Sequence, residues 1–376
     1  MFAARIRAEG GTDRSPWGDF WFQPVSARGM TGQRVNADNA LRLSAVYACV
    51  RVLAETMATL PFVLYRNKAN GGKERVTDHW LYRLLAKQPN RWQNAFEWRE
   101  MMQAHLALRG NAFCEMSING RGEITELLPL HPDRVKIEML NGTDWRYRIK
   151  NVDGSERTLP PGMVFKLTGL SSNGLLGLSP IDLAREAIGL GLSAQEFGAR
   201  FFANDARPLG GWIEFPGRFK TTQDRMSFAE SWQAAQGGNN RGKTAVLQDG
   251  MKFHEIGLTN RDSQFIELRQ AQVADIARFW RVPPHMIGDL TRSTNSNVEH
   301  HGAEFAIYTM TPWGERWEAA IETQLLTDED DLEVEFDFNG LLRGDHAARA
   351  AFYTQAINAG WLTRNEVRLE ENRDPL

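Results

Sequence analysis

Residues 281–297 read RVPPHMIGDLTRSTNSN and lie between two long stretches of helical pattern within the segment 260–326. The first stretch carries apolar residues at roughly helical spacing, namely Phe265, Leu268, Val273, Ile276 and Trp280. Pro283 and Pro284 must end that helix, because proline lacks the N–H group and its ring clashes with the preceding turn. Residues 291–297 include no apolar side chain, so they have no reason to be buried. The sequence therefore predicts a polar loop held between two helices, and we interpret this loop as a functional part of the protein.

The composition is that of an ordinary globular protein. The chain has 376 residues, 42% of them hydrophobic and 24% charged, which is enough to build a core and more than one substructure. A net charge of -3 argues against a simple nucleic-acid coat, because proteins that neutralise many phosphates are usually basic. Any contact with DNA is therefore expected to be local or transient.

Two cysteines, Cys49 and Cys114, lie far apart in apolar segments, so neither a disulfide framework nor a cysteine-based metal site is predicted. No signal peptide is expected, since residues 1–12 lack an apolar run. No stretch approaches the ~18 apolar residues of a membrane-spanning helix. These features favour the cytosol and no membrane partner.

The first half of the chain predicts an arm, two helices and a block of short strands. Residues 1–40 read as an extended arm, 44–60 as a helix ended by Pro61, and 62–66 as a strand. A second helix is expected over 94–108. Strands are then expected at 112–118, 124–130, 135–139, 145–149 and 163–167, separated by Asn-Gly and Asp-Gly turns.

The second half predicts long helices around a small mixed insert. Ser179 and Pro180 open a helix that can run to Ala203, about 24 residues or ~36 Å. The insert is expected to contain strands at 211–215, 244–248 and 251–256 and a helix at 222–236. A strand at 332–338 and helices at 345–359 and 363–370 complete an α+β fold.

One stretch matches a nucleotide-binding pattern. Residues 237–244, GGNNRGKT, fit GxxxxGK[ST] and include Lys243. A working phosphate loop follows a strand and opens a helix, whereas this one follows a predicted helix and leads into a β-like run. A turn is therefore the favoured interpretation, and a nucleotide-dependent enzyme is the weaker alternative.

Other groupings of polar residues give no catalytic or metal site. His300 and His301 with Glu304 have poor spacing for a metal, because adjacent helical residues point about 100° apart. The acidic run 328–331 is interpreted as a solvated loop before a strand. No Ser/His/Asp or Cys/His arrangement can be argued, so we predict no enzyme activity, catalytic residue, metal or cofactor.

Several segments, in this order and spacing, carry a resemblance to a known family. They are residues 44–50 through Leu60-Pro61, Gly110-Asn111-Ala112-Phe113, 174–181 with Ser179-Pro180, Phe201-Phe202-Ala203-Asn204, 282–288 with Pro283-Pro284, Thr311-Pro312-Trp313 and 363–368. Together they resemble the portal proteins of tailed double-stranded DNA bacteriophages, specifically the large family of long-tailed phages. The resemblance spans nearly the whole chain.

The resemblance implies a homo-oligomeric ring, usually of twelve copies, at one vertex of the capsid, assembled in the host cytoplasm and present in the virion. The resemblance also implies a central channel through which viral DNA passes during packaging and ejection. The implied partners are the large terminase subunit, the major capsid protein and scaffold, and a head–tail adaptor. The resemblance further implies that ATP hydrolysis belongs to the separate terminase, which agrees with the interpretation of Lys243 as part of a turn.

The resemblance also divides the chain into parts. It implies an arm at 1–40, a wing at 41–178, stem helices at 179–205 and 259–283, a clip at 206–258, a tunnel-loop region at 284–298, a channel helix returning to the wing at 299–344, and a short crown at 345–376. We expect the tunnel loop to touch the duplex through Thr291, Arg292, Ser293, Thr294, Asn295 and Asn297. We expect the clip to meet terminase or adaptor through Arg218, Lys220, Arg225, Arg241 and Lys243. A scaffold or adaptor that never binds DNA remains a second alternative.

Overall fold

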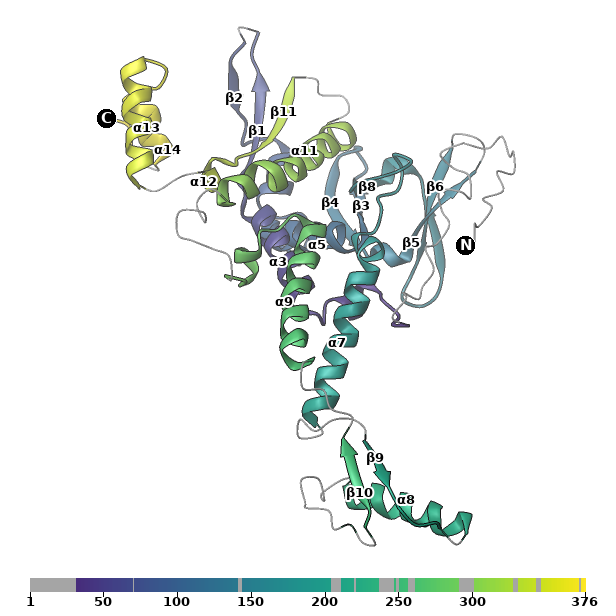
Figure 1. Cartoon of the computed structure of the whole chain (residues 1–376). Coiled ribbons are helices and arrows are strands. Elements are labelled where there is room, and N and C mark those ends of the chain that lie inside the picture. The colour runs from purple at the N-terminus through teal and green to yellow at the C-terminus, as the bar shows by residue number, and fades with distance from the viewer. Residues whose placement is uncertain are drawn as a thin grey trace, which may run out of the picture. The chain divides into compact units, whose positions relative to one another are not determined.

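The computed structural model describes residues 32–69, 71–140, 144–203, 211–219, 221–236, 247, 250–255, 261–290, 301–326, 331–342, 346–371 and 373–376. The described chain forms two compact units. The first contains Ser44–Leu183 and Ala277–Leu376, and the second contains residues 32–43 and Ala184–Ile276. The architecture is mixed helix and sheet, as predicted (Figure 1).

The first unit is built around a pair of packed helices. Helix α3 (Ser44–Thr59) buries its predicted apolar face, including Val46, Leu53 and Met57, against α5 (Ala95–Arg109). Helix α5 begins at an Asn94 capping box with Glu97 and ends at Gly110, whose φ of 71° gives the left-handed cap. The short helix α4 (Trp80–Ala86), which the sequence pattern did not predict, also packs against α5.

One sheet joins the two ends of this unit. Strand β1 (Phe62–Asn67) pairs antiparallel with β2 (Lys73–Arg75) on one side and with β11 (Leu332–Phe336) on the other. Strand β11 is an edge strand, and two carboxylates of helix α11 (Thr311–Leu325) accept its outward N–H groups. Val334 N donates to Glu322 at 3.0 Å, and Phe336 N donates to Glu318 at 2.6 Å. Four helical residues rise ~6 Å and two strand residues ~6.7 Å, so the i, i+4 carboxylates match alternate strand residues.

The predicted block of strands forms two further sheets. Strands β3 (Asn111–Ile118), β4 (Ile124–Leu130) and β8 (Val164–Thr168) pair in the order β4-β3-β8. Strands β5 (Val135–Met139), β6 (Trp145–Lys150) and β7 (Glu156–Leu159) form the other sheet, and the 3₁₀ turns η1 (Pro132–Arg134) and η2 (Pro161–Met163) precede β5 and β8. Phe113, Tyr147 and Val164 form a buried cluster shared by these strands. Strands β2 and β7 were not predicted, because each is short and largely exposed.

The predicted single helix over 180–203 is divided. Helix α6 (Pro180–Leu183) belongs to the first unit, and α7 (Arg185–Ala203) follows a turn at Ala184 in the second. Ser179 Oγ accepts from Asp182 N at 3.2 Å, which confirms its role as the N-cap. Helix α7 lies beside α9 (Arg261–Trp280) (Figure 1), and Gln272 Nε2 donates to Ala187 O at 2.9 Å. Gly191 permits this approach, since a Cβ there would lie 2.8 Å from Gln272 Nε2.

Three other parts of the chain lie outside these sheets and helix pairs. The insert consists of the hairpin β9 (Gly211–Glu214) and β10 (Lys252–Glu255) with helix α8 (Thr222–Gln236). Part of the predicted arm is the helical turn α2 (Ala37–Ala40), and residues 1–31 lie outside the described residues. After α12 (Asn339–Leu342), helices α13 (His346–Ala359) and α14 (Arg364–Glu370) are joined by the Arg349–Glu371 ion pair at 3.2 Å.

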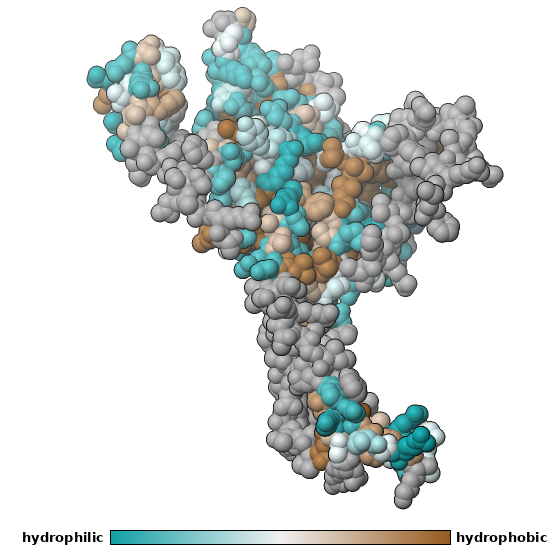
Figure 2. Space-filling model, viewed as in Figure 1, coloured by the Kyte–Doolittle hydropathy of each residue, from teal (hydrophilic) through white to brown (hydrophobic). Residues whose placement is uncertain are grey.

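Hydrophilic and hydrophobic residues are unevenly distributed on the face drawn in Figure 2. In Figure 2 the region of the β1–β2 hairpin is mostly hydrophilic, and hydrophobic residues gather lower on the first unit. No described helix combines the length and the apolar character needed to cross a bilayer.

Candidate functional site

The predicted loop and most of the predicted clip contacts fall where the structure gives no description. The segment 291–300 lies outside the described residues, and it contains Thr291, Arg292, Ser293, Thr294, Asn295 and Asn297. Lys220, Arg241 and Lys243 of the predicted clip also lie outside the described residues. Arg218 and Arg225 are described, and both are exposed. The two supports of the segment 291–300, residues 276–290 and 301–312, are described.

Helix α9 ends as predicted, before the prolines, in a Schellman motif. Arg281 N donates to Arg278 O at 3.2 Å, and Val282 N donates to Ala277 O at 3.1 Å. The left-handed residue of this motif is usually glycine, but here it is Arg281 with φ of 53°. An L-residue in this region costs roughly 1–2 kcal/mol. The side chain at this position is therefore expected to contribute something that glycine cannot.

The end of α9 is anchored to the core. Trp280 is buried, and its Nε1 donates to Ala107 O of α5 at 2.8 Å. Val282 is also buried. Pro283 and Pro284 then lead into the 3₁₀ turn η4 (Pro284–Ile287), which ends at Gly288 with φ of 86°. The upstream support is thus fixed by burial and by hydrogen bonds.

The downstream support contains a widened helical turn. Residues 301–304 are helical and lead into the π-helix η5 (Phe305–Met310), which runs directly into α11. Thr311 N bonds to Ala306 O, five residues back, and Thr311 Oγ1 donates to the same carbonyl at 3.0 Å. π-helical turns are rare and occur frequently at functional sites.

Side chains connect the two supports. Arg281 Nη1 donates to Tyr308 O at 3.1 Å, and Thr309 Oγ1 donates to Arg281 O at 2.9 Å. The rings of His285 and His301 stack with centroids 5.7 Å apart. Burial lowers the pKa of His285, and the neighbouring His301 lowers it further. A neutral His285 is therefore favoured, which suits two imidazoles held face to face.

His301 also approaches Glu304, with Nδ1 3.0 Å from Oε2. Among the described residues there is no group of three His, Cys, Asp or Glu side chains able to hold a metal ion. His300 lies outside the described residues. The chemistry at these supports is therefore hydrogen bonding and packing.

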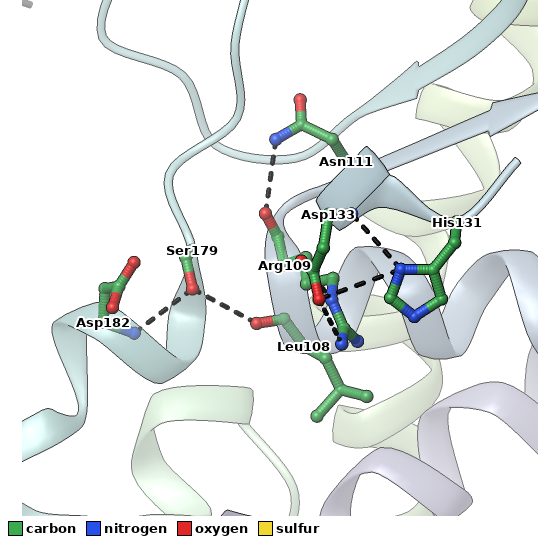
Figure 3. Close-up of polar contacts among 7 residues, drawn as sticks. All are labelled: Leu108, Arg109, Asn111, His131, Asp133, Ser179 and Asp182. Atoms are coloured by element: carbon green, nitrogen blue, oxygen red, sulfur yellow. Dashed lines mark hydrogen bonds and ion pairs between the residues drawn. The ribbon is translucent and has the colours of Figure 1, made fainter. Parts of the chain in front are cut away.

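A second group of contacts lies at the end of α5, where Figure 3 shows Ser179 bonded to the Leu108 carbonyl and Asn111 bonded to the Arg109 carbonyl. Further contacts join the segments 110–113 and 174–181. The side-chain amide of Asn111 bonds to both backbone polar groups of Gly177. Its Nδ2 donates to Gly177 O at 3.0 Å, and its Oδ1 accepts from Gly177 N at 2.9 Å. Ser179 Oγ donates to Leu108 O at 3.2 Å. A Cβ on Gly110 would lie 2.1 Å from Leu178 O, so glycine is required there. These motif residues therefore have a structural role.

A charged cluster also lies at the end of α5. Arg109 forms a bidentate pair with Asp133, with Nε–Oδ1 and Nη2–Oδ2 both at 2.8 Å (Figure 3). This hydrogen bonding lowers the pKa of Asp133. Burial, with Arg109 and His131 nearby, lowers the pKa of His105 to about 4. His105 is therefore neutral near pH 7, and the cluster stabilises the turn η1.

The insert is held by a row of aromatic rings. Phe215, Phe219, Phe228, Trp232 and Phe253 contact one another in sequence, with centroid distances of 5.0, 5.8, 6.4 and 5.7 Å. Helix α8 ends at Gln236, immediately before the GxxxxGK[ST] match. The match therefore follows a helix, as predicted, and residues 237–246 themselves lie outside the described residues.

Sequence reasoning missed the contribution of Arg281 and Thr309. The sequence feature that could have pointed to Arg281 and Thr309 is Pro312. A proline inside a helical pattern indicates a kink or a break in regular hydrogen bonding. No sequence pattern shows that Arg281 supplies the compensating contact, because the two residues meet only in the folded chain.

Comparison with known proteins matches residues 44–372 to the family model described as phage portal protein. The chain is 33% identical over 359 residues to the portal protein of Enterobacteria phage HK97, covering 94% of this chain and 84% of the relative. It is 34% identical over 370 residues to a probable portal protein of Streptomyces phage phiC31, covering 94% of this chain and 79% of the relative. A chain from the neck of a native GTA particle computed with C12 symmetry has the same fold, with a TM-score of 0.60, 21% identity, and coverage of 95% and 99%. This chain therefore belongs to the phage portal protein family.

Proposed function

We propose that this chain forms the ring at the unique vertex of a phage capsid and lines the channel through which viral DNA is packaged and ejected. The observation that carries the proposal is the family match over residues 44–372, which takes in both supports of the segment 291–300. The fold likeness to a neck chain computed with C12 symmetry supports a ring, and we propose twelve copies. The portal family is structural, and we assign no catalytic step, metal or cofactor to the chain.

The proposed parts of the portal follow one another along the chain. The arm is 1–40, the wing 41–178, the stem helices 179–205 and 259–283, the clip 206–258, the tunnel-loop region 284–298, the channel helix with its return to the wing 299–344, and the short crown 345–376. Within the range proposed for the first stem helix, a turn at Ala184 separates α6 from α7. Within the range proposed for the second stem helix, α9 ends at Trp280, which is bonded to Ala107.

Within this arrangement Thr291, Arg292, Ser293, Thr294, Asn295 and Asn297 contact the duplex as it moves. DNA must slide, so tight phosphate binding would oppose the function. A single arginine and several short polar groups per subunit give weak contacts, and repetition around a ring makes them collective. The net charge of -3 per chain agrees with a channel that does not hold DNA tightly.

The clip is proposed to meet the large terminase subunit and later the head–tail adaptor through Arg218, Lys220, Arg225, Arg241 and Lys243. The exposed positions of Arg218 and Arg225 support a contact role. The wing is proposed to meet the major capsid protein and scaffold.

Electron microscopy of the purified protein tests the ring, and closed rings with an axial channel are expected. A protein that stays monomeric under all conditions of assembly would count against the proposal. The loop is tested by deleting residues 291–296, which should leave rings intact and impair DNA packaging. Replacing the same six residues by Gly and Ser is the matched control for loop length, and normal packaging by the deletion variant would remove the role of the loop.

A further inference from the structure

Arg281 occupies a backbone position that disfavours arginine. It is the non-glycine residue with positive φ among the described residues, at the left-handed position of the motif that ends α9. Glycine would satisfy the same backbone hydrogen bonds without strain. Strain retained in this way points to a use for the side chain.

Pro312 creates a need in the helix that faces Arg281. In α-helical register the carbonyl of Tyr308 would accept from the N–H of residue 312, and Pro312 has none. The proline ring would also clash with that carbonyl. The π-helical turn Phe305–Met310 widens the helix at this point, as the Thr311-to-Ala306 bond shows.

The guanidinium of Arg281 meets this need. Its Nη1 donates to Tyr308 O at 3.1 Å, and Thr309 Oγ1 returns a bond to Arg281 O at 2.9 Å. The second bond also satisfies a carbonyl at the end of α9, where no further helical donor follows. The two contacts are adjacent and reciprocal, so loss of one partner weakens both.

We infer that Arg281 is a positioning residue: with Thr309 it latches the end of α9 to the turn Phe305–Met310 and holds that turn in its π register. The register decides where Ile307 and Tyr308 face, because a shift of one residue turns a helical side chain by about 100°. These side chains are 49% and 66% exposed, so the register decides what this part of the helix presents to its surroundings. As the inference concerns the start of the proposed channel helix, its biological meaning rests on the proposed function, but the latch itself does not.

Hydrogen–deuterium exchange of the full-length protein tests the latch. The comparison uses wild type, Arg281→Gly, Thr309→Val, the double variant, and Thr309→Ser as the conservative control. Arg281→Gly should raise exchange in peptides covering 301–311 at least tenfold while the thermal midpoint stays equal or rises, because glycine relieves the backbone strain. Thr309→Val should act in the same direction, the double variant should add little, and Thr309→Ser should match wild type.

A suppressor separates a latch from a general structural contact. Pro312→Ala restores the missing N–H and removes the ring, so the carbonyl of Tyr308 can accept from residue 312 in α-helical register and the turn no longer depends on Arg281. In that background Arg281→Gly should leave exchange at 301–311 unchanged. The inference is overturned if Arg281→Gly does not raise exchange in the wild-type background, or if it raises exchange equally in the Pro312→Ala background.

Ring formation and packaging are measured on the same variants. Increased exchange with normal rings and packaging would support the latch and show that the register is not limiting for the portal. Unchanged exchange with impaired packaging would refute the latch and leave the proposed function standing. The two failures are therefore distinguishable.

Discussion

Trp98 of α5 and Trp317 of α11 meet edge to face at the centre of the first unit, with ring centroids 5.6 Å apart and both side chains fully buried. Phe165 of β8 packs on Trp98, and Phe336 of β11 packs on Trp317. Each indole has a polar partner, since Trp98 Nε1 donates to Cys114 Sγ at 3.3 Å and Trp317 Nε1 donates to Gln103 Oε1 at 2.9 Å. This pair therefore holds α11, which continues from the downstream support, against α5.

The effects of substituting Trp317 and Gln103 on the free energy of unfolding should be coupled, because the two side chains share a buried hydrogen bond. Trp317→Phe removes the donor and leaves the buried Gln103 oxygen unsatisfied, which should cost roughly 1–3 kcal/mol of unfolding free energy beyond the lost volume. Adding Gln103→Met should recover part of this loss, because the buried amide is then gone. Urea unfolding of the two single variants and the double variant measures the coupling. Trp361→Phe, at an exposed position, is the control and should change stability by less than about 0.5 kcal/mol. Strictly additive losses at Trp317 and Gln103 would contradict the coupling.

Gly110→Ala should be strongly destabilising. The new Cβ would lie 2.1 Å from Leu178 O in a residue with φ of +71°, so both strain and a clash with backbone oppose it. We expect a loss of at least about 2 kcal/mol, seen as a lower thermal midpoint or as insoluble protein. Gly120→Ala is the matched control, since nothing lies within 4 Å of its Cβ position and its φ is not positive. Equal midpoints for the two variants would mean that the backbone around Gly110 and Leu178 shifts without a measurable loss of stability.

Glu318 should make stability depend on pH near neutrality. Burial, with Glu315, Glu335 and Glu322 nearby, raises the pKa of Glu318 from 4.5 to about 7, although the hydrogen bond from Phe336 N opposes the shift. Because the folded-state pKa lies above the unfolded value, the stabilising contribution is present at low pH and is lost as pH rises through about 7. Glu318→Gln should therefore become more stable relative to wild type between pH 5 and pH 8.

Urea midpoints at pH 5, 6, 7 and 8 check this prediction. Glu74→Gln is the control, since Glu74 is an exposed carboxylate of β2 paired with Lys68 at 3.1 Å. Its difference from wild type should stay flat over the same range. A flat difference for Glu318→Gln as well would show that the carboxylate is already ionised at pH 5.

The exposed arginines of the insert should contribute to terminase binding through charge. Arg218→Ala with Arg225→Ala should weaken binding of the large terminase subunit about fivefold, as expected for about 0.5 kcal/mol per exposed charge. The loss should be larger at low salt, because screening is weaker there. Surface plasmon resonance at two salt concentrations measures both effects. Arg75→Ala, an exposed arginine outside the insert, should bind like wild type. Unchanged binding by the double variant would remove these residues from the contact.

The sequence predicted regular elements well where a local period was strong. Helix α8 begins and ends where the pattern placed it, and the strands at 124–130 and 135–139 match β4 and β5. Elements without a clear period were missed, as with α4, β2 and β7, and the break at Ala184 inside an unbroken helical pattern was not expected. The predicted contact residues 291–297 remain predictions, and they lie outside the described residues.

By itself the sequence determined the fold class, the end of α9 before Pro283, the polar nature of the loop and the family resemblance, because each depends on residue types at short, regular spacing. Only the tertiary structure decided that Asn111 holds Gly177, that Glu318 and Glu322 cap the edge of β11, and that Arg281 meets Tyr308 and Thr309. These contacts join residues far apart in the chain, and their energies arise from burial and from unsatisfied carbonyl and N–H groups that exist only once the helices are packed. A local pattern can show that Pro312 leaves a carbonyl without its donor, but only the folded chain brings the guanidinium that supplies one.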